Sequence, residues 1–349
     1  MFNQDFYITF YNGGFILVNT QTKQCFEMDK DSIVNLFSKN PEEIQDYIAA
    51  GMIKGKEDYS KVIIDDEKWP MQPISRLFHN NVSIKESELS DLSEEEYWED
   101  YLSECSRAGD IAKVVEKVEG KRISLPQAKP VRGDFYDLCK KRKTIREFIN
   151  KPISLQDFSD VLFTAFGNFH DGFDNEILDS EKNYAWRRSS PAAGSLNSVS
   201  PYLFVSNVDG LKKGIYYYDS IKHELVDLEK DFDELILVKY MSNQPFLKNA
   251  AFHVLSVANL NVICGKYPFA RSYILPYLDN GHLFQTAFLA VTALNLEYWV
   301  SAALCADGFK KLIGFEDFQI PISFFSVGNG HHDSLGPKFT SLLLEKKNK

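Results

Sequence analysis

The chain has 349 residues, of which 44% are apolar and 25% are charged, so its composition is that of a globular protein rather than a disordered one. Its 39 basic and 49 acidic residues give a net charge of -10, which argues against nonspecific binding to nucleic acid or to an anionic membrane. Its cysteines show no CxxC spacing and its start lacks the features of a signal peptide, so we expect no disulfide framework, no metal site and a cytoplasmic location.

Residues 1–60 are predicted to form a small module of strands and helices. Short β-rich runs lie between Phe6 and Met28 and are separated by turn signals, so we expect hairpins. Two amphipathic helical patterns follow, at Lys30–Ser38 and Pro41–Ala50. This winged-helix-like layout resembles the PqqD-like module of ribosomal peptide maturation, in which a bound peptide extends a sheet edge. The alternative is an N-terminal packing layer.

Residues 61–130 are predicted to be a helical, acidic connecting segment. Its most acidic part, from Ile84 to Asp110, is interrupted by Tyr97, Trp98, Tyr101 and Leu102. Such a run is usually the solvated face of a helix, and we assign it no function. Two prolines between Ile123 and Val131 then indicate an extended connector into the next domain, residues 131–349.

A basic cluster follows Asp134. A helix is expected to end in it and to include Thr144, and Pro152 precedes a second helix. The cluster consists of Lys140, Lys141, Arg142, Lys143 and Arg146. Several cations beside a hydroxyl form a clamp for a phosphate monoester, because each can donate a charge-assisted hydrogen bond. The alternative is a solvated basic face.

A turn of small residues, Pro191–Gly194, lies in the motif RRSSPAAGSL and precedes the strand patterns PYLFVSNV and GIYYYD. Small side chains let the backbone approach a flat ligand, and backbone N–H groups in such a turn can bond to ring heteroatoms. The motif is not a dinucleotide fingerprint, because the chain has neither GxGxxG nor GxxxxGK[ST] at this point.

Lys266 and Tyr267 place an amine beside a phenol. Neighbouring side chains on a regular helix diverge, so the two groups converge most easily in a loop or at a helix start, which Pro268 favours. Because burial weakens the hold of a lysine on its proton, the pair could transfer protons. The alternative is two side chains that extend into solvent from a helix end.

The segment Gly281–Val300 is apolar on nearly every side and is predicted to be a buried helix. Its polar residues argue against a membrane span. They are His282, Gln285, Thr286, Thr292, Asn295 and Glu297.

The order of these motifs resembles the flavin-dependent nitroreductase superfamily, and within it the SagB/ThcOx type of azoline dehydrogenase, over about Phe78 to Gly328. The resemblance implies an α+β fold, a mostly antiparallel sheet wrapped by helices, in a homodimer that holds FMN at its interface. It implies that the FMN phosphate and ribityl chain are bound by Arg142, Lys143, Thr144 and Arg146. It implies further flavin contacts from Ser190, Pro191, Ala192, Ala193, Gly194 and Gly328. The usual serine of the turn is alanine here, and Asn197 and Ser198 replace a usual Tyr-Pro pair.

The resemblance also implies a reaction. A thiazoline or oxazoline ring of a precursor peptide would lose a proton to Lys266 and Tyr267 and a hydride to FMN. The implied partners are a YcaO-type cyclodehydratase and a leader-binding protein. Two alternatives stay open: an NAD(P)H-dependent reductase of the nitroreductase type, and a scaffold subunit of a peptide-modifying complex that has lost turnover.

Overall fold

The structure is a computed structural model, and its contacts divide the chain into two units, Met1–Asp91 and Leu92–Lys349. Boundaries at residues 60 and 130 therefore stay predictions. The structure describes residues 6–11, 14–19, 25–29, 31, 33, 75, 78–79, 82–84, 91–112, 118–171, 186–333 and 336–347.

The described part of the first unit holds an antiparallel sheet in the order β1-β2-β3. The strands are β1 (Phe6–Tyr11), β2 (Gly14–Asn19) and β3 (Cys25–Met28), so the predicted hairpins are confirmed. Leu17 and Val18 on the central strand are buried. The two predicted helices lie almost entirely outside the described residues, and a winged helix therefore remains a prediction.

The second unit is built around an 8-stranded sheet in the order β12-β13-β11-β8-β9-β10-β4, with β5 paired to β13. The pairs of this sheet are antiparallel. Its strands are β4 (Lys121–Ser124), β5 (Phe148–Ile149), β8 (Val199–Val205), β9 (Gly214–Asp219), β10 (Glu224–Lys230), β11 (Phe252–Asn259), β12 (Glu297–Ser301) and β13 (Gln319–Gly330). A separate pair joins β6 (His170–Asp171) to β7 (Trp186–Arg187).

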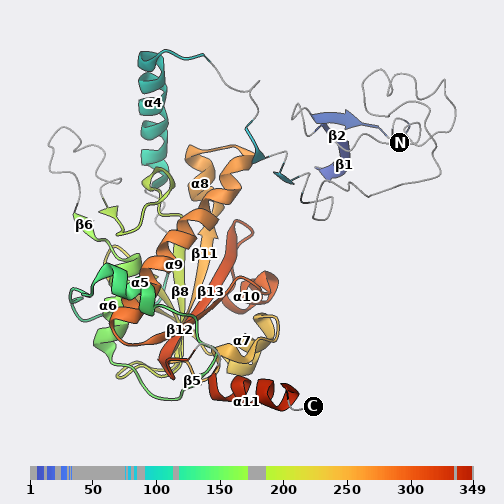
Figure 1. Ribbon diagram of the computed structural model, residues 1–349. Coiled ribbons are helices and arrows are strands. Elements are labelled where there is room, and N and C mark those ends of the chain that lie inside the picture. The colour runs from blue at the N-terminus through green and yellow to red at the C-terminus, as the bar shows by residue number, and fades with distance from the viewer. Residues whose placement is uncertain are drawn as a thin grey trace. The chain divides into compact units, whose positions relative to one another are not determined.

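Helices cover the sheet on both faces (Figure 1). The α-helices are α4 (Glu94–Ala112), α5 (Phe135–Lys141), α6 (Leu155–Phe166), α7 (Glu234–Tyr240), α8 (Leu260–Lys266), α9 (Leu275–Ala293), α10 (Ala306–Ile313) and α11 (Gly336–Lys347). Three short 3-10 turns are η3 (Ala193–Ser195), η4 (Pro245–Leu247) and η5 (Ala270–Ile274). No helix in the described ranges is long and apolar enough to cross a membrane.

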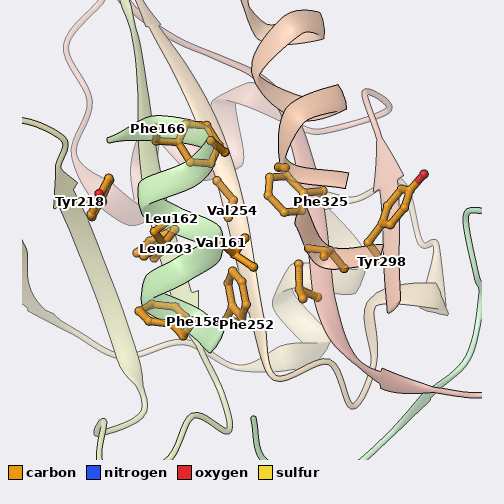
Figure 2. Close-up of a cluster of buried hydrophobic side chains, with 14 of the residues drawn as sticks. Phe158, Val161, Leu162, Phe166, Leu203, Tyr218, Phe252, Val254, Tyr298 and Phe325 are labelled. Atoms are coloured by element: carbon orange, nitrogen blue, oxygen red, sulfur yellow. The ribbon is translucent and has the colours of Figure 1, made fainter. Parts of the chain in front are cut away.

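Alternation along the central strands separates two apolar layers, because successive side chains of a strand point to opposite faces. On β8, Leu203 packs with α6 and α9, whereas Phe204 packs with α7 and α10. Figure 2 shows the first layer, in which Phe158 of α6 lies against Phe252 of β11 with ring centroids 4.8 Å apart. The predicted strands β8 and β9 and the helix after Pro152 are confirmed.

Three predicted boundaries are wrong. The helix predicted over Gly281–Val300 runs from Leu275 to Ala293, and the chain then enters strand β12. Asn295 has a left-handed backbone (φ 57°) that ends the helix, and both elements are buried, so one apolar run covers them. Helix α5 ends at Lys141 and excludes Thr144. Lys266 ends helix α8 rather than starting a helix.

We predict that Phe158→Ala lowers the free energy of unfolding by about 3 to 5 kcal/mol, because it empties a fully buried aromatic site. Urea denaturation followed by circular dichroism measures the loss. Phe135→Ala is the control, because Phe135 is 71% exposed and its removal is expected to change stability by less than about 0.5 kcal/mol. Equal losses in the two variants would contradict the assignment of the core.

Candidate active site

The small-residue turn predicted at Pro191–Gly194 has an unusual backbone. Gly194 has φ 55° and ψ 20°, and Ser195 and Asn197 also have positive φ angles of 57° and 49°. The Asn197 side chain supports this shape by donating from Nδ2 to the carbonyl of Ser195 at 3.1 Å. Because left-handed residues other than glycine cost free energy, the surrounding structure must hold the turn in place.

Helix α9 holds the start of the turn. The backbone N–H of Ala193 donates to Asp279 Oδ1 at 3.0 Å. The Ser190 hydroxyl lies 2.6 Å from Thr286 Oγ1 and donates to the carbonyl of His282 at 3.3 Å. Asp279, His282 and Thr286 follow one another at intervals of three and four residues, so they lie along one face of the helix. Two successive turns of α9 thus fix the loop.

Helix α8 and strand β11 hold the end of the turn. The N–H of Asn259, the last residue of β11, donates to the carbonyl of Ser198 at 2.9 Å. The Asn259 side chain also caps α8 by accepting from the N–H of Asn261 at 3.1 Å. Leu196 and Ile263 form a small apolar cluster between the turn and α8. Asn259 therefore both caps α8 and bonds to the turn, which positions the helix against the turn.

This arrangement brings the Lys266 and Tyr267 pair to Gly194. A Cβ atom built on Gly194 would lie 2.7 Å from Tyr267 Oη and 3.1 Å from Lys266 Cδ, so a larger residue would have to displace these side chains, and the positive φ also favours glycine. Lys266 is 5% exposed, and its Nζ lies 5.5 Å from the centre of the Tyr267 ring. The Tyr267 phenol and the alkyl chain of Lys266 therefore lie against the turn, and the Lys266 amine lies near the Tyr267 ring.

Two buried charged groups stand next to the turn. Arg188 donates to the carbonyls of Phe166 and Val199 at 3.1 and 2.8 Å, and burial lowers the pKa of its guanidinium to about 10. Burial also raises the pKa of the Asp279 carboxyl, although the hydrogen bond from Ala193 acts in the opposite direction. Asp279 Oδ2 is buried and has no hydrogen-bond partner among the residues the structure describes. A ligand lying on the turn could satisfy this oxygen.

The predicted phosphate clamp lies at strand β12. Arg142 donates to the hydroxyl of Tyr298, and Thr144 forms a parallel bridge with the same residue. The Tyr298 ring stacks on Phe288 of α9 with centroids 3.9 Å apart. Lys143 is half-buried, whereas Arg146 is exposed and lies 5.8 Å from the centre of the Phe246 ring. Arg142, Thr144 and Tyr298 are therefore gathered, and the Arg146 guanidinium lies over the Phe246 ring.

Helix α9 connects the two groups of predicted residues. Asp279 contacts the turn and Phe288 contacts Tyr298, and nine residues of helix correspond to roughly 14 Å along its axis. The clamp and the turn are thus apart, as is needed for the two ends of an extended ligand. Gly328 differs, because a Cβ on it would lie 3.0 Å from the backbone nitrogen of Ala251. Close packing against the neighbouring backbone therefore accounts for a glycine at position 328. The contact of Gly328 with a cofactor stays a prediction.

Sequence reasoning missed Arg188, Tyr298 and Tyr101. Arg188 lies inside the motif that contains the turn, so its charge in an otherwise small-residue segment was an available signal. Tyr298 was assigned to a helix, and the aromatic and β-branched run Tyr298–Val300 was the signal for a strand. Tyr101 was assigned to a solvated face, yet its ring centre lies 5.3 Å from Lys266 Nζ. Within the described ranges, no cluster of His, Cys, Asp or Glu is arranged to hold a metal ion.

We predict that Gly194→Ala destabilises the protein by at least about 1 kcal/mol more than Gly210→Ala does. Both glycines have positive φ angles, but a Cβ meets nothing within 4 Å at Gly210 and meets Tyr267 Oη at Gly194. Tyr267→Phe removes that oxygen and should restore part of the loss in a double variant. Denaturant unfolding of the wild type, Gly194→Ala, Tyr267→Phe and the double variant measures this coupling. Strictly additive effects of the two substitutions would contradict the contact.

Comparison with known proteins was made with this geometry in hand. The sequence pattern described as the nitroreductase family matches residues 139–329. A Methanocaldococcus jannaschii protein named as a nitroreductase is 24% identical over 208 residues, covering 59% of this chain and 95% of that protein. A solved structure from Ralstonia eutropha JMP134, also named as a nitroreductase, is 20% identical with a TM-score of 0.49, covering 60% of this chain and 90% of that one.

A chain in the E. coli microcin synthetase McbBCD complex with truncated pro-MccB17 bound is 17% identical with a TM-score of 0.46. That match covers 74% of this chain and 92% of the E. coli chain. The family pattern spans more than half of the 349 residues. The chain therefore belongs to the nitroreductase family and has the α+β fold predicted for it.

Proposed function

We propose that the protein is an FMN-dependent azoline dehydrogenase, which oxidises a thiazoline or oxazoline ring of a ribosomally made peptide to a thiazole or oxazole. Membership of the nitroreductase family supports the coarser part of this statement, a flavin-type oxidoreductase. The observation that carries the finer part is the contact of Lys266 and Tyr267 with the backbone of Gly194. An amine and a phenol at a turn suited to a flat ring supply proton transfer where the ring would react.

The residues of the site fit FMN. The buried Asp279 Oδ2, which has no hydrogen-bond partner among the described residues, marks a position beside the turn where a ligand group could donate a hydrogen bond. Arg142, Lys143 and Thr144 offer two cations and a hydroxyl to a phosphate, and Arg146 follows on the exposed side. The turn from Ser190 through Pro191, Ala192, Ala193 and Gly194 would lie along the isoalloxazine ring. When bound, FMN would accept the hydride taken from the substrate.

Lys266 and Tyr267 would handle the proton. Conversion of an azoline to an azole removes one proton and one hydride and leaves a new C=C bond in the ring. The buried amine of Lys266, in its neutral form, would accept the proton. The aromatic faces next to Nζ then stabilise the ammonium that forms. Tyr267 Oη, in contact with the Gly194 position, would orient the reacting ring or pass the proton to the amine.

The proposal includes partners. The substrate ring would be made by a YcaO-type cyclodehydratase from a precursor peptide that a leader-binding protein delivers. We also propose a homodimer in which both subunits contact FMN. Helix α9 supports it, because Tyr277 and Leu278 are 44% and 56% exposed beside the buried Asp279. An apolar surface of this kind next to the turn is suited to a second subunit.

A second candidate is an NAD(P)H-dependent reductase of nitro compounds or quinones. It is favoured by the match to the M. jannaschii protein, which spans nearly all of that protein but only 59% of this chain. Stopped-flow mixing of the FMN-loaded protein with NADH or NADPH separates the two. Rapid bleaching of the flavin without peptide supports the reductase, and no bleaching supports the dehydrogenase. A protein that cannot be loaded with FMN would support a scaffold without turnover.

We predict that Arg142→Ala weakens FMN binding by about tenfold or more, because it removes a charge-assisted hydrogen bond to the phosphate. Titration of the apoprotein with FMN, followed by quenching of flavin fluorescence, measures the dissociation constant. Arg132→Ala is the matched control, because Arg132 is exposed and precedes the cluster. Unchanged affinity in Arg142→Ala would remove Arg142 from the binding site.

We predict that Lys266→Ala and Tyr267→Phe each slow azole formation by about a hundredfold, the usual scale for loss of a general base, while FMN stays bound. The substrate is a synthetic peptide with one thiazoline, and mass spectrometry follows the loss of two hydrogens. Lys212→Ala, at an exposed lysine beyond the site, should retain full activity. Wild-type rates in both test variants would refute their assignment as proton acceptors.

A further inference from the structure

Helix α4 lies beside α8, although it precedes the residues matched to the nitroreductase family (Figure 1). It brings one side chain, Tyr101, against the Lys266 amine. The Tyr101 ring centre is 5.3 Å from Lys266 Nζ, and the Tyr267 ring centre is 5.5 Å from the same atom. The ammonium form of Lys266 would therefore contact the faces of two aromatic rings, one from each of two segments far apart in the chain.

The start of α4 is fixed by a capping box. The N–H of Ser93 donates to Glu96 Oε2 at 2.9 Å, and the N–H of Glu96 donates to Ser93 Oγ at 3.3 Å. The N–H and the hydroxyl of Ser93 both donate to the Glu96 carboxyl, and these two bonds lower its pKa. The first turn of the helix is thus defined, and Tyr101 follows one turn later on the side that faces α8.

Two further aromatic residues support the Tyr101 ring. Tyr97 stacks on Tyr101 with centroids 6.3 Å apart, and Trp98 meets it edge to face at 5.8 Å. The exposed fractions of Tyr97, Trp98 and Tyr101 are 53%, 52% and 39%. Rings this exposed contribute little to a core. Tyr97 and Trp98 instead restrict the rotation of the Tyr101 ring, which lies near Lys266.

The exposure of Lys266 decides between two interpretations of the contact. A lysine at a helix end normally extends its amine into water. Lys266 instead is 5% exposed, and its amine lies between aromatic rings. The amine therefore lies against these rings, and one of them belongs to a helix outside the family-matched region.

We propose that Tyr101 is a positioning residue for the reaction, which holds the Lys266 amine at the turn and stabilises its protonated form through its ring face. This inference rests on the proposed function, since it acts through Lys266. It makes α4 part of the active site and assigns a role to the acidic, aromatic segment that precedes the family-matched residues.

The test compares Tyr101→Leu, which keeps an apolar side chain but loses the ring, with Tyr101→Phe, which keeps the ring. With the synthetic thiazoline peptide, Tyr101→Leu is expected to lower kcat about tenfold with KM changed by less than about twofold. Tyr101→Phe is expected to retain kcat. Tyr136→Leu is the matched control, because Tyr136 is 75% exposed on α5. Wild-type kcat in Tyr101→Leu, or an equal loss in Tyr101→Phe, would overturn the role of the ring.

A second measurement does not depend on turnover. Acetylation of Lys266 in the folded protein by limiting acetic anhydride, followed by digestion and mass spectrometry of the peptides, reports how shielded the amine is. Loss of the Tyr101 ring uncovers the amine, so the labelling of Lys266 is expected to rise several-fold in Tyr101→Leu and not in Tyr101→Phe. Unchanged labelling refutes the contact. Normal activity of Lys266→Ala would instead refute the proposed function and leave the labelling result standing.

Discussion

The close approach between the backbone at Gly194 and the hydroxyl of Tyr267 is the constraint on which the site depends. A Cβ at residue 194 would lie 2.7 Å from that oxygen, so glycine lets the turn and the end of α8 meet without a shift of Tyr267. The left-handed backbone of Ser195 and Asn197 beside it requires support. Asp279, Ser190 and Asn259 supply it through hydrogen bonds from α9 and β11. The turn around Gly194 therefore matters both for the stability of the fold and for the proposed reaction.

Helix α9 contacts both groups of predicted site residues. Asp279 and Thr286 of α9 form hydrogen bonds to the turn residues Ala193 and Ser190. Further along the helix, the Phe288 ring stacks on Tyr298, whose hydroxyl accepts a hydrogen bond from Arg142. The inner face of α9 belongs to the apolar layer shared with α6, and this fixes its position on the sheet. A rigid core element thus sets the spacing between the turn and the basic cluster.

Local patterns predicted much of the fold and part of the site. The strand patterns after the RRSSPAAGSL motif predicted β8 and β9, and small residues predicted the turn at Pro191–Gly194. The continuous apolar run after Gly281 hid the change from α9 to β12, because two buried elements in succession have no polar boundary. The contact of Tyr101 with Lys266 was beyond prediction, because it depends on the packing of α4 on α8 and not on any local pattern.

The most direct test of the account is a crystal structure of the protein after saturation with FMN. The account predicts an isoalloxazine ring against Pro191–Gly194 with Lys266 and Tyr267 facing it, and a phosphate among Arg142, Lys143 and Thr144. A flavin bound elsewhere, or these positions filled by side chains at saturating FMN, would contradict it.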